Sequence, residues 1–336
     1  MKQKNNSGIA TKIIGTLAIP IVILLVLLII CGSGGKSLIA NDTGFNNFVV
    51  YTAIVMITTM ALSINLNSGR FDFSLGSMAT LSAVVSAKIT YAIFGAEGNA
   101  LVMLAFCLVL GGILGLLSGI VYVKLRIPPI IASLGVTLVF EGITYTITEG
   151  RYVMTEVQNS SMSDFIGTWV YAAVIILVVL GAVYFIFDRT KFGYNYRALR
   201  DGQKVASDTG IKEVPNAIGC YVICGALMGI VGFLLAARNS NINGGSLNFG
   251  SISIMFTAFL PMFIGGYIGR FSNEKLGYFL AAICMSLLNS TFAAFANEIN
   301  ASMQSIINAV LLVVFLIYLS NEYRIHQVIR NLKSKD

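Results

Sequence analysis

Charged residues are scarce in this sequence. Aspartate, glutamate, lysine and arginine make up 11% of its 336 residues, whereas soluble domains contain roughly 25%. Hydrophobic residues reach 56%, and the mean hydropathy is +0.82. This balance excludes an ordinary soluble domain and predicts an integral membrane protein.

The net charge of +7 does not indicate a nucleic-acid-binding protein. Basic residues fall between long apolar runs and form no continuous stripe, which is the usual mark of a nucleic-acid interface. Membrane lipid is the expected partner for this positive charge, because the inner leaflet of a cell membrane is negative.

Residues that support catalysis are missing or isolated. The only histidine, His326, lies near the C-terminus among charged residues, which excludes a histidine-based metal site or catalytic dyad within the membrane. The five cysteines show no metal-ligand spacing. Among the carboxylates, only Asp72 and Glu141 are placed to enter the bilayer. The sequence therefore predicts a protein that is not an enzyme and that uses no metal or cofactor.

A nucleotide-binding loop is also missing. The stretch GSGGKS (32–37) resembles the end of such a motif, but Ile30 stands where its first glycine belongs. An apolar run precedes the stretch, whereas the motif follows a strand. Any ATP hydrolysis that drives this protein must therefore take place on a separate subunit.

Long apolar runs are what the sequence has in abundance. A helix needs about 20 mainly apolar residues to cross a hydrocarbon core about 30 Å thick. By this measure residues 1–336 form a single all-α, polytopic membrane domain. The first apolar run exceeds the usual length of a secretion signal, so we expect it to be a membrane helix. The ten expected spans are 10–32, 45–64, 73–94, 99–122, 128–148, 168–187, 216–237, 251–269, 276–297 and 302–320.

Lysine and arginine predict the orientation of these spans, because they gather on the cytoplasmic side. With the N-terminus inside, all but four of the 22 basic residues face the cytoplasm. The exceptions are Lys36, Lys88, Arg151 and Arg238. We therefore expect a multi-pass protein of a bacterial cell (inner or plasma) membrane with both termini in the cytoplasm.

Three polar segments are long enough to meet partners. The outer segments are 149–167 and 239–250, and the longest inner one is 188–215. The inner segment separates two halves, 45–148 and 216–320, each with four expected spans. This parallel between the halves suggests an internal duplication.

Glycines recur at four-residue spacing on one expected helix in each half. Gly111, Gly115 and Gly119 do so in the first half, and Gly225 and Gly229 in the second. Small residues at this spacing let helix backbones approach closely where lipid gives no hydrophobic drive. We expect tight helix packing at both stretches.

A polar stretch, NLNSGRFDFSLGS (65–77), interrupts apolar sequence between the second and third spans. Its glycines, serines and asparagines break a helix, and Asp72 stands where it could accept hydrogen bonds from freed backbone amides. A structural capping role is the first interpretation, and lining a translocation route is the alternative. Arg70 offers a neighbouring counter-charge or a contact to a lipid phosphate.

The inner segment contains a helical pattern of small residues. Ala198, Gly202, Val205 and Thr209 fall at i, i+4, i+7 and i+11, which predicts one continuous helix with a face that docks into a groove. The residues that end this helix and begin the next span are Gly210 and Pro215. The alternative is a solvated basic loop beside anionic lipid.

Four stretches together resemble a known family. GRFDFSLGS (69–77) resembles the GGIDLSVGS signature of permease subunits of ribose-type, or monosaccharide, ABC importers, within the branched-chain amino acid/ribose permease superfamily. IPPIIASLGVTLVFEG (127–142), RALRDGQKVASDTGIK (197–212) and ICGALMGIVGFLLAAR (223–238) are similar to further segments of that family, in the same order. Arg70 replaces the second glycine of the signature, and 261–277 keeps only part of a glycine-rich segment.

The resemblance implies a transmembrane permease subunit of an ATP-driven, binding-protein-dependent importer of a sugar or similar hydroxylated solute. Its partners would be an ATP-binding ABC subunit in the cytoplasm, an extracytoplasmic solute-binding protein, and a second permease copy or homologue. An ion-coupled secondary transporter that acts alone is the alternative. The signature residues carried over are Gly69, Asp72, Ser74 and Gly76. The residues that would couple to the ATPase are Arg197, Ala198, Arg200, Asp201, Gly202, Ala206, Gly210 and Ile211.

Polar side chains on apolar helices are the candidates for a translocation pathway, because they can hydrogen-bond a hydroxylated solute. Helix-packing hydrogen bonds are the alternative role for each of them. The candidates are Asn65, Asn67, Ser133, Glu141, Tyr145 and Asn289. The identity of the cargo stays open among pentoses, hexoses, inositol, a signalling furanose and nucleosides.

Overall fold

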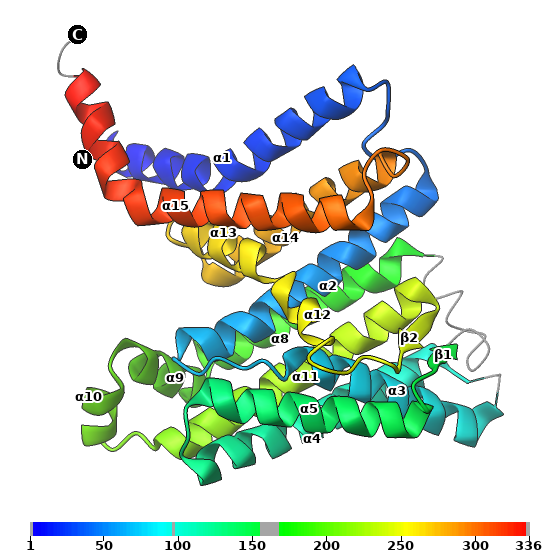
Figure 1. Ribbon diagram of the computed structural model, residues 1–336. Coiled ribbons are helices and arrows are strands. Elements are labelled where there is room, and N and C mark those ends of the chain that lie inside the picture. Colours follow the sequence, from blue (N-terminus) through cyan, green and yellow to red (C-terminus); the bar gives the residue numbers. More distant parts are fainter. Residues whose placement is uncertain (1–2, 96–97, 155–167, 334–336) are drawn as a thin grey trace.

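The computed structural model describes residues 3–95, 98–154 and 168–333, and this part of the chain is almost entirely helical (Figure 1). Its two short strands, β1 (Tyr152–Met154) and β2 (Asn241–Asn243), pair antiparallel. The helices are α1 (Gln3–Ser33), α2 (Asp42–Asn67), α3 (Leu75–Phe94), α4 (Ala100–Leu125), α5 (Pro129–Thr148), α8 (Trp169–Arg189), α9 (Lys191–Asp201), α10 (Gln203–Asp208), α11 (Glu213–Asn239), α12 (Ile252–Phe256), α13 (Phe259–Gly269), α14 (Glu274–Ala294) and α15 (Ala301–Lys333).

Ten helical segments in the described residues are long and apolar enough to cross a membrane. Each coincides with a span predicted from the sequence, within a few residues at its ends. The span Ile252–Gly269 consists of two shorter helices, α12 and α13, where the sequence predicts one. The protein is an all-α, multi-pass membrane protein, as predicted.

The centre of the molecule is α2. Its residues from Val49 to Asn65 are nearly all buried, and it contacts α8, α11, α13 and α14. Figure 1 shows α2 crossing between one group of helices that contains α3, α4, α5 and α11 and another that contains α1, α13, α14 and α15. A movement of one group relative to the other therefore has to involve α2.

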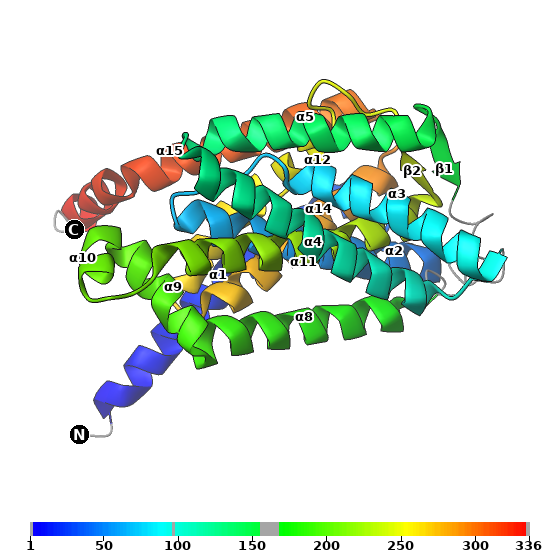
Figure 2. The ribbon, with the colours of Figure 1, turned by 90° about the horizontal axis from the view of Figure 1, so that it is seen from below.

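The most extensive helix contact joins α4 and α11, which cross in the middle of the view in Figure 2. A methyl group added to Gly111 would collide with the backbone oxygen of Gly225, and one on Gly225 would collide with that of Gly111. The same holds for Gly229 against Cys107. The two backbones touch directly, so the predicted packing role of these glycines is confirmed.

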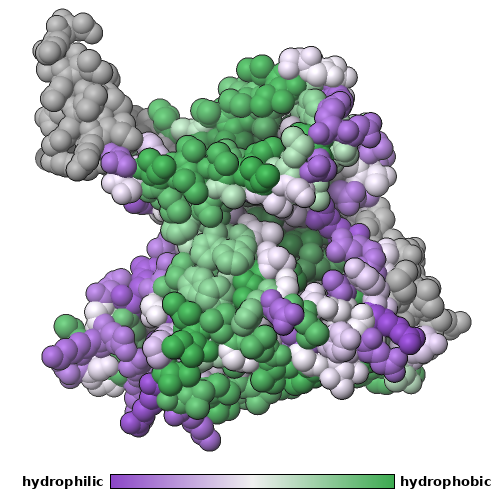
Figure 3. Space-filling view, in the orientation of Figure 1, coloured by the Kyte–Doolittle hydropathy of each residue, from purple (hydrophilic) through white to green (hydrophobic). Residues whose placement is uncertain are grey.

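Apolar side chains cover the middle of the surface, and polar ones gather at two ends (Figure 3). One polar end carries α9 and α10, and the other carries the strands and their neighbouring loops. Between the two ends, α1, α4, α5, α8 and α15 expose many large apolar side chains. This distribution fits a bilayer that surrounds the middle of the protein.

Candidate functional site

The polar stretch between α2 and α3 folds around Asp72, which is 1% exposed. Its Oδ1 accepts hydrogen bonds from the backbone N–H and the hydroxyl of Ser74, at 2.9 and 2.6 Å, and its Oδ2 accepts from the Asn65 amide at 3.4 Å. Burial raises the pKa of the Asp72 carboxyl, and these hydrogen bonds oppose the rise. Gly69 supplies the left-handed turn, with φ of +75°. The predicted capping of the third span is therefore present.

Arg70 does not lie at the surface, where a lipid phosphate could reach it. The side chain is 3% exposed, and its Nη1 donates to the Ser68 hydroxyl at 3.5 Å. No ion pair between Arg70 and Asp72 occurs in the described part of the chain. The suggested lipid contact is wrong, because the break turns this side chain inward.

A second buried carboxylate serves the start of α12. Glu141 on α5 accepts from the Ser251 N–H at 2.9 Å and the Ser251 hydroxyl with Oε1, and from the Phe249 N–H at 2.9 Å with Oε2. The backbone here is strained, because Asn248 and Phe249 both have positive φ. Glu141 thus satisfies three donors at a turn that costs energy to form.

The two carboxylate-capped starts lie against each other. A methyl group on Gly76, in the first turn of α3, would collide with the backbone oxygen of Ser251. Ser74 and Ser251 therefore begin two helices that meet, one from each half of the chain. Glycine at position 76 is needed for this contact, since any side chain there would push the starts apart.

The inner segment does not form the continuous helix that the small-residue pattern predicts. α9 ends at Asp201, and Gly202, with φ −175° and ψ 84°, separates it from α10. Val205 is 70% exposed, whereas Ala206 is buried. The prediction of one continuous helix through Gly202 and Val205 is wrong, because the backbone at the glycine rotates α10 relative to α9.

Residues at the end of α10 shape the return to the membrane. The Ile211 N–H donates to the Ala206 carbonyl at 3.2 Å, and Gly210 adopts φ of +90°. Pro215 falls in the first turn of α11, where its missing N–H is tolerated. The predicted helix end at Gly210 and the predicted helix start at Pro215 are confirmed.

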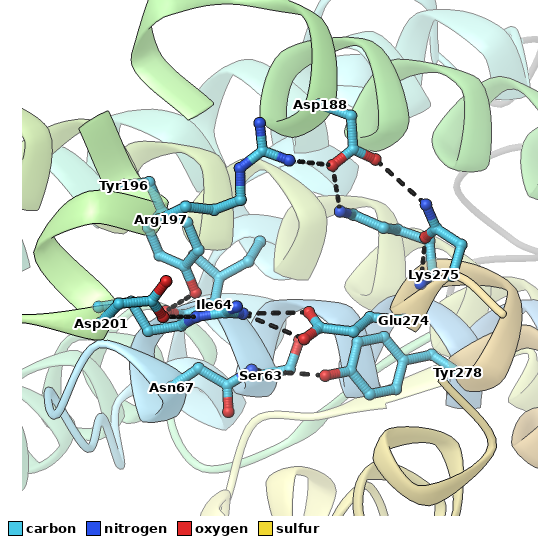
Figure 4. A network of polar contacts seen from close by, with 12 residues as sticks. Ser63, Ile64, Asn67, Asp188, Tyr196, Arg197, Asp201, Glu274, Lys275 and Tyr278 are labelled. Atoms are coloured by element: carbon cyan, nitrogen blue, oxygen red, sulfur yellow. Dashed lines mark hydrogen bonds and ion pairs between the residues drawn. The ribbon is translucent and has the colours of Figure 1, made fainter. Parts of the chain in front are cut away.

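Ion pairs tie α9 to the start of α14 (Figure 4). Asp188, at the end of α8, accepts from Arg197 at 3.1 Å and from Lys275 at 2.8 Å. Arg200 pairs with Glu274 at 3.1 Å. This cluster, which we call the inner network, connects three elements that are far apart in the sequence.

Two tyrosines join the same region to α2. The Tyr196 hydroxyl donates to the Ile64 carbonyl at 2.9 Å, and the Tyr278 hydroxyl accepts from the Asn67 amide at 3.4 Å. Together with the inner network they line a cavity of about 300 Å³ (Figure 4). Residues on α2, α8, α9 and α14 thus converge on one polar cavity.

Sequence reasoning missed most of this site. It placed Arg197, Arg200 and Asp201 in the coupling segment, but it named neither Asp188 and Glu274 nor the tyrosines. The available signal was weak: both carboxylates stand beside basic residues at helix ends, a common pattern at any cytoplasmic boundary. Asp201 pairs only with its neighbour Arg200, at 3.3 Å, among the described ion pairs.

The candidate pathway residues do not converge on one cavity within a single chain. Asn65 contacts Asp72, and Asn67 reaches the inner cavity. Ser133 donates to the carbonyl of its own helix at Ile130, so its hydroxyl serves local packing. The Tyr145 side chain is 42% exposed on α5.

Asn289 lies at the opposite end, in a cavity of about 400 Å³ formed by the α1–α2 linker, α11 and α14. Arg238 lines the same cavity, and its guanidinium lies 4.6 Å from the centre of the Tyr51 ring. Nearby, Lys36 pairs with Glu298 at 2.8 Å and lies 4.1 Å above the Phe295 ring. The two polar ends of the molecule therefore each hold a cavity with arginine in its wall.

Comparison with known proteins decides the family. The family model described as "Branched-chain amino acid transport system / permease component" matches residues 44–316. The chain belongs to this permease family. The matched region of the permease begins in α2 and ends in α15, so it contains the break at Asp72, the inner network and the glycine contact, while α1 precedes it.

Curated relatives of the permease include several sugar permeases. It is 26% identical to the ribose import permease protein RbsC of Escherichia coli over 66% of this chain and 69% of the relative. It is 27% identical to the galactose/methyl galactoside import permease protein MglC of Haemophilus influenzae, over 64% and 70%. Identity to the galactofuranose transporter permease protein YtfT of Escherichia coli is 23%, over 84% and 81%.

No solved structure matches the permease. The predicted resemblance to ribose-type permeases is confirmed by the family match and by these relatives. The protein is a transporter component and not an enzyme.

Proposed function

We propose that this chain is the membrane-spanning subunit of an ATP-driven importer that receives a sugar, or a similar hydroxylated solute, from a binding protein. The observation that carries the proposal is the inner network together with Tyr196 and Tyr278, which join α9 to α14 and to α2. The names of the relatives support the solute class, since they include ribose, galactose and galactofuranose permeases.

An ATP-binding subunit would dock on α9 and α10 from the cytoplasm. The exposed side chain of Val205 offers it an apolar contact, and Gly202 lets α10 tilt relative to α9. The coupling residues named from the sequence, Ala206, Gly210 and Ile211 among them, shape this element. A push on it would pass through Arg200 and Glu274 to α14, and through Tyr196 to α2.

Alternation between two packings would then move the solute. A second copy or a homologue would face this chain and complete the pathway, with Ser133, Glu141 and Tyr145 on α5 as contributors. The buried donors that Glu141 satisfies give it a structural role as well.

The two halves, 45–148 and 216–320, would derive from a duplication: α11 packs on α3 and α4, as α2 packs on α13 and α14.

The outer partner would be a solute-binding protein. The strands and the cavity around Arg238 lie at the end opposite α9 and α10, and the polar segment 239–250 begins there. Most of the outer segment 149–167 lies outside the described residues. In this proposal both termini lie in the cytoplasm of a bacterial cell and the protein lies in its inner membrane, and the basic residues of α9 and α10 at the end opposite the strands support that orientation.

Reconstitution tests the proposal. Uptake of a labelled sugar into vesicles should require ATP, the binding protein and the ATP-binding subunit. Uptake that an ion gradient drives without that subunit would contradict it and support a secondary transporter instead. Nothing in the inner network points to a particular coupling ion.

Replacement of Asp188 by Asn gives a sharper test within the same assay. The substitution removes the charge that holds Arg197 and Lys275 and leaves two cations uncompensated. We expect stimulated ATP hydrolysis to fall at least about tenfold, equivalent to about 1.4 kcal/mol, while the ATPase subunit still co-purifies. Asp42→Asn, an exposed carboxylate in the first turn of α2 at the opposite end of the protein, is the control and should change little. Equal effects of the two substitutions would contradict the coupling role.

A further inference from the structure

A long apolar groove lies at the edge of the molecule and shares no lining residue with the cavity of the inner network or with the cavity around Arg238. Its sides are α1 and α15, and α13 and α14 form its floor (Figure 1). The groove has a volume of about 770 Å³. It extends along α1 from Gly15 to Ile30, which is about 22 Å at the rise of an α-helix. That length covers most of one hydrocarbon core.

One end of this groove is polar. Tyr267 on α13 and Tyr318 on α15 both line it, and their hydroxyl oxygens lie 3.3 Å apart. The Arg270 guanidinium lies 5.3 Å from the centre of the Tyr267 ring. The groove therefore combines a long apolar channel with hydroxyl and guanidinium groups at a single end.

A second cation stands at the same end. Gly15 packs directly against the Phe271 ring, the residue after Arg270. Lys12 lies one turn before Gly15 on α1 and is exposed. Two basic residues on two different elements thus stand at this end of the groove. Arg270 directly follows α13, and Glu274 begins α14, so this polar end of the groove is at the same end of the protein as α9 and the inner network.

We propose that the groove binds an anionic phospholipid, with the acyl chains along α1, α13 and α15 and the phosphate at Arg270 and the tyrosine hydroxyls. Basic pockets between membrane helices at the cytoplasmic side suit anionic head groups, and tyrosine favours the membrane interface. The site lies apart from the coupling element and is independent of which solute the protein carries.

The chemistry of the groove argues for lipid over a helix of another protein. Its lining is apolar along its length, and its two tyrosine hydroxyls lie at one end, beside Arg270. A molecule with apolar chains and a single charged head group matches this arrangement. Extended acyl chains are narrow enough to enter it, and the two basic side chains select the charge of the head group.

Photoactivatable lipids test the proposal in full-length protein. Vesicles of phosphatidylcholine would carry either a phosphatidylglycerol or a phosphatidylcholine probe with the same diazirine-bearing acyl chain. Labelled residues would be located by mass spectrometry. We expect Ile264 and Leu311, which line the groove, to be labelled about fivefold more by the phosphatidylglycerol probe, the factor that one basic residue supplies near an anionic surface.

Substitutions test the head-group end and the acyl-chain groove separately. Arg270→Gln should remove the preference for phosphatidylglycerol, whereas Lys204→Gln, an exposed cation on α10, should preserve it. Ala18→Phe fills the groove and should abolish labelling of Leu311 by both probes, with the elution profile of the protein unchanged. Equal labelling by the two probes in the unmodified protein would overturn the anionic site. Labelling of exposed Leu101 on α4 by both probes, with no labelling of Ile264 or Leu311 by either, would overturn lipid as the occupant.

Discussion

The two helix starts at Ser74 and Ser251 use the same chemistry in different ways. Each serine donates its N–H and its hydroxyl to a buried carboxylate. Asp72 is two residues from its serine, whereas Glu141 belongs to another helix and is 110 residues away. A local cap stabilises one helix start. A remote cap also fixes the position of α5 against α12, so it joins the two halves of the chain.

Loss of the remote cap should have the largest effect. Glu141→Ala leaves the N–H groups of Phe249 and Ser251 and one hydroxyl without their acceptor, and each such group costs about 1–3 kcal/mol when buried. We expect the free energy of unfolding in detergent to fall by about 3 kcal/mol or more. Glu149→Ala removes an exposed carboxylate from the end of the same helix and should cost less than about 1 kcal/mol. A similar loss in both variants would show that the remote cap carries no special weight.

The contact between the two starts should come next in size. Gly76→Ala forces a methyl group into the Ser251 backbone oxygen, and overpacking of this kind typically costs about 1–3 kcal/mol. Gly142→Ala is the matched control on α5, because no atom lies within 4 Å of a methyl group there. Alanine at position 142 should instead stabilise the helix by up to about 1 kcal/mol. Thermal unfolding midpoints that move in the same direction for both variants would contradict the close contact.

The local cap should tolerate replacement of its carboxylate by an amide better than the remote cap does. Asp72→Asn keeps an oxygen for Ser74, and the facing Asn65 side chain can rotate to present its own oxygen to the new amide. No such rearrangement is available to Glu141→Gln, because both carboxylate oxygens of Glu141 accept hydrogen bonds from backbone N–H groups. We expect a loss below about 1 kcal/mol at position 72 and a larger one at position 141. Chemical unfolding of the two variants side by side gives the comparison, and equal losses would remove the distinction.

The same contrast explains what the sequence could and could not predict. The ten spans follow from apolar length, and the glycine contact of α4 with α11 follows from four-residue spacing. The Asp72 cap was predictable because donor and acceptor lie two residues apart. Glu141 was recognised as a polar residue on an apolar helix, but the sequence contains no sign that its partners are Phe249 and Ser251.

The inner network shows a second limit. Charges near membrane boundaries are common, and they predict orientation without specifying which lysine meets which aspartate. The break at Gly202 was missed for a different reason: the helical period continues through the glycine, although glycine weakens a helix by about 1 kcal/mol relative to alanine. A prediction from periodicity alone therefore treats α9 and α10 as one helix, although the backbone at Gly202 separates them.

The touching backbones of α4 and α11 limit where the protein can change shape. Sliding or rotating this pair would drive backbone atoms of the two helices into each other, since no side chain stands between Gly111 and Gly225 to adjust its rotamer. The two helices should move together as one rigid body. Conformational changes during transport must then occur at helix interfaces lined by deformable side chains, chiefly those of α2 with α13 and α14.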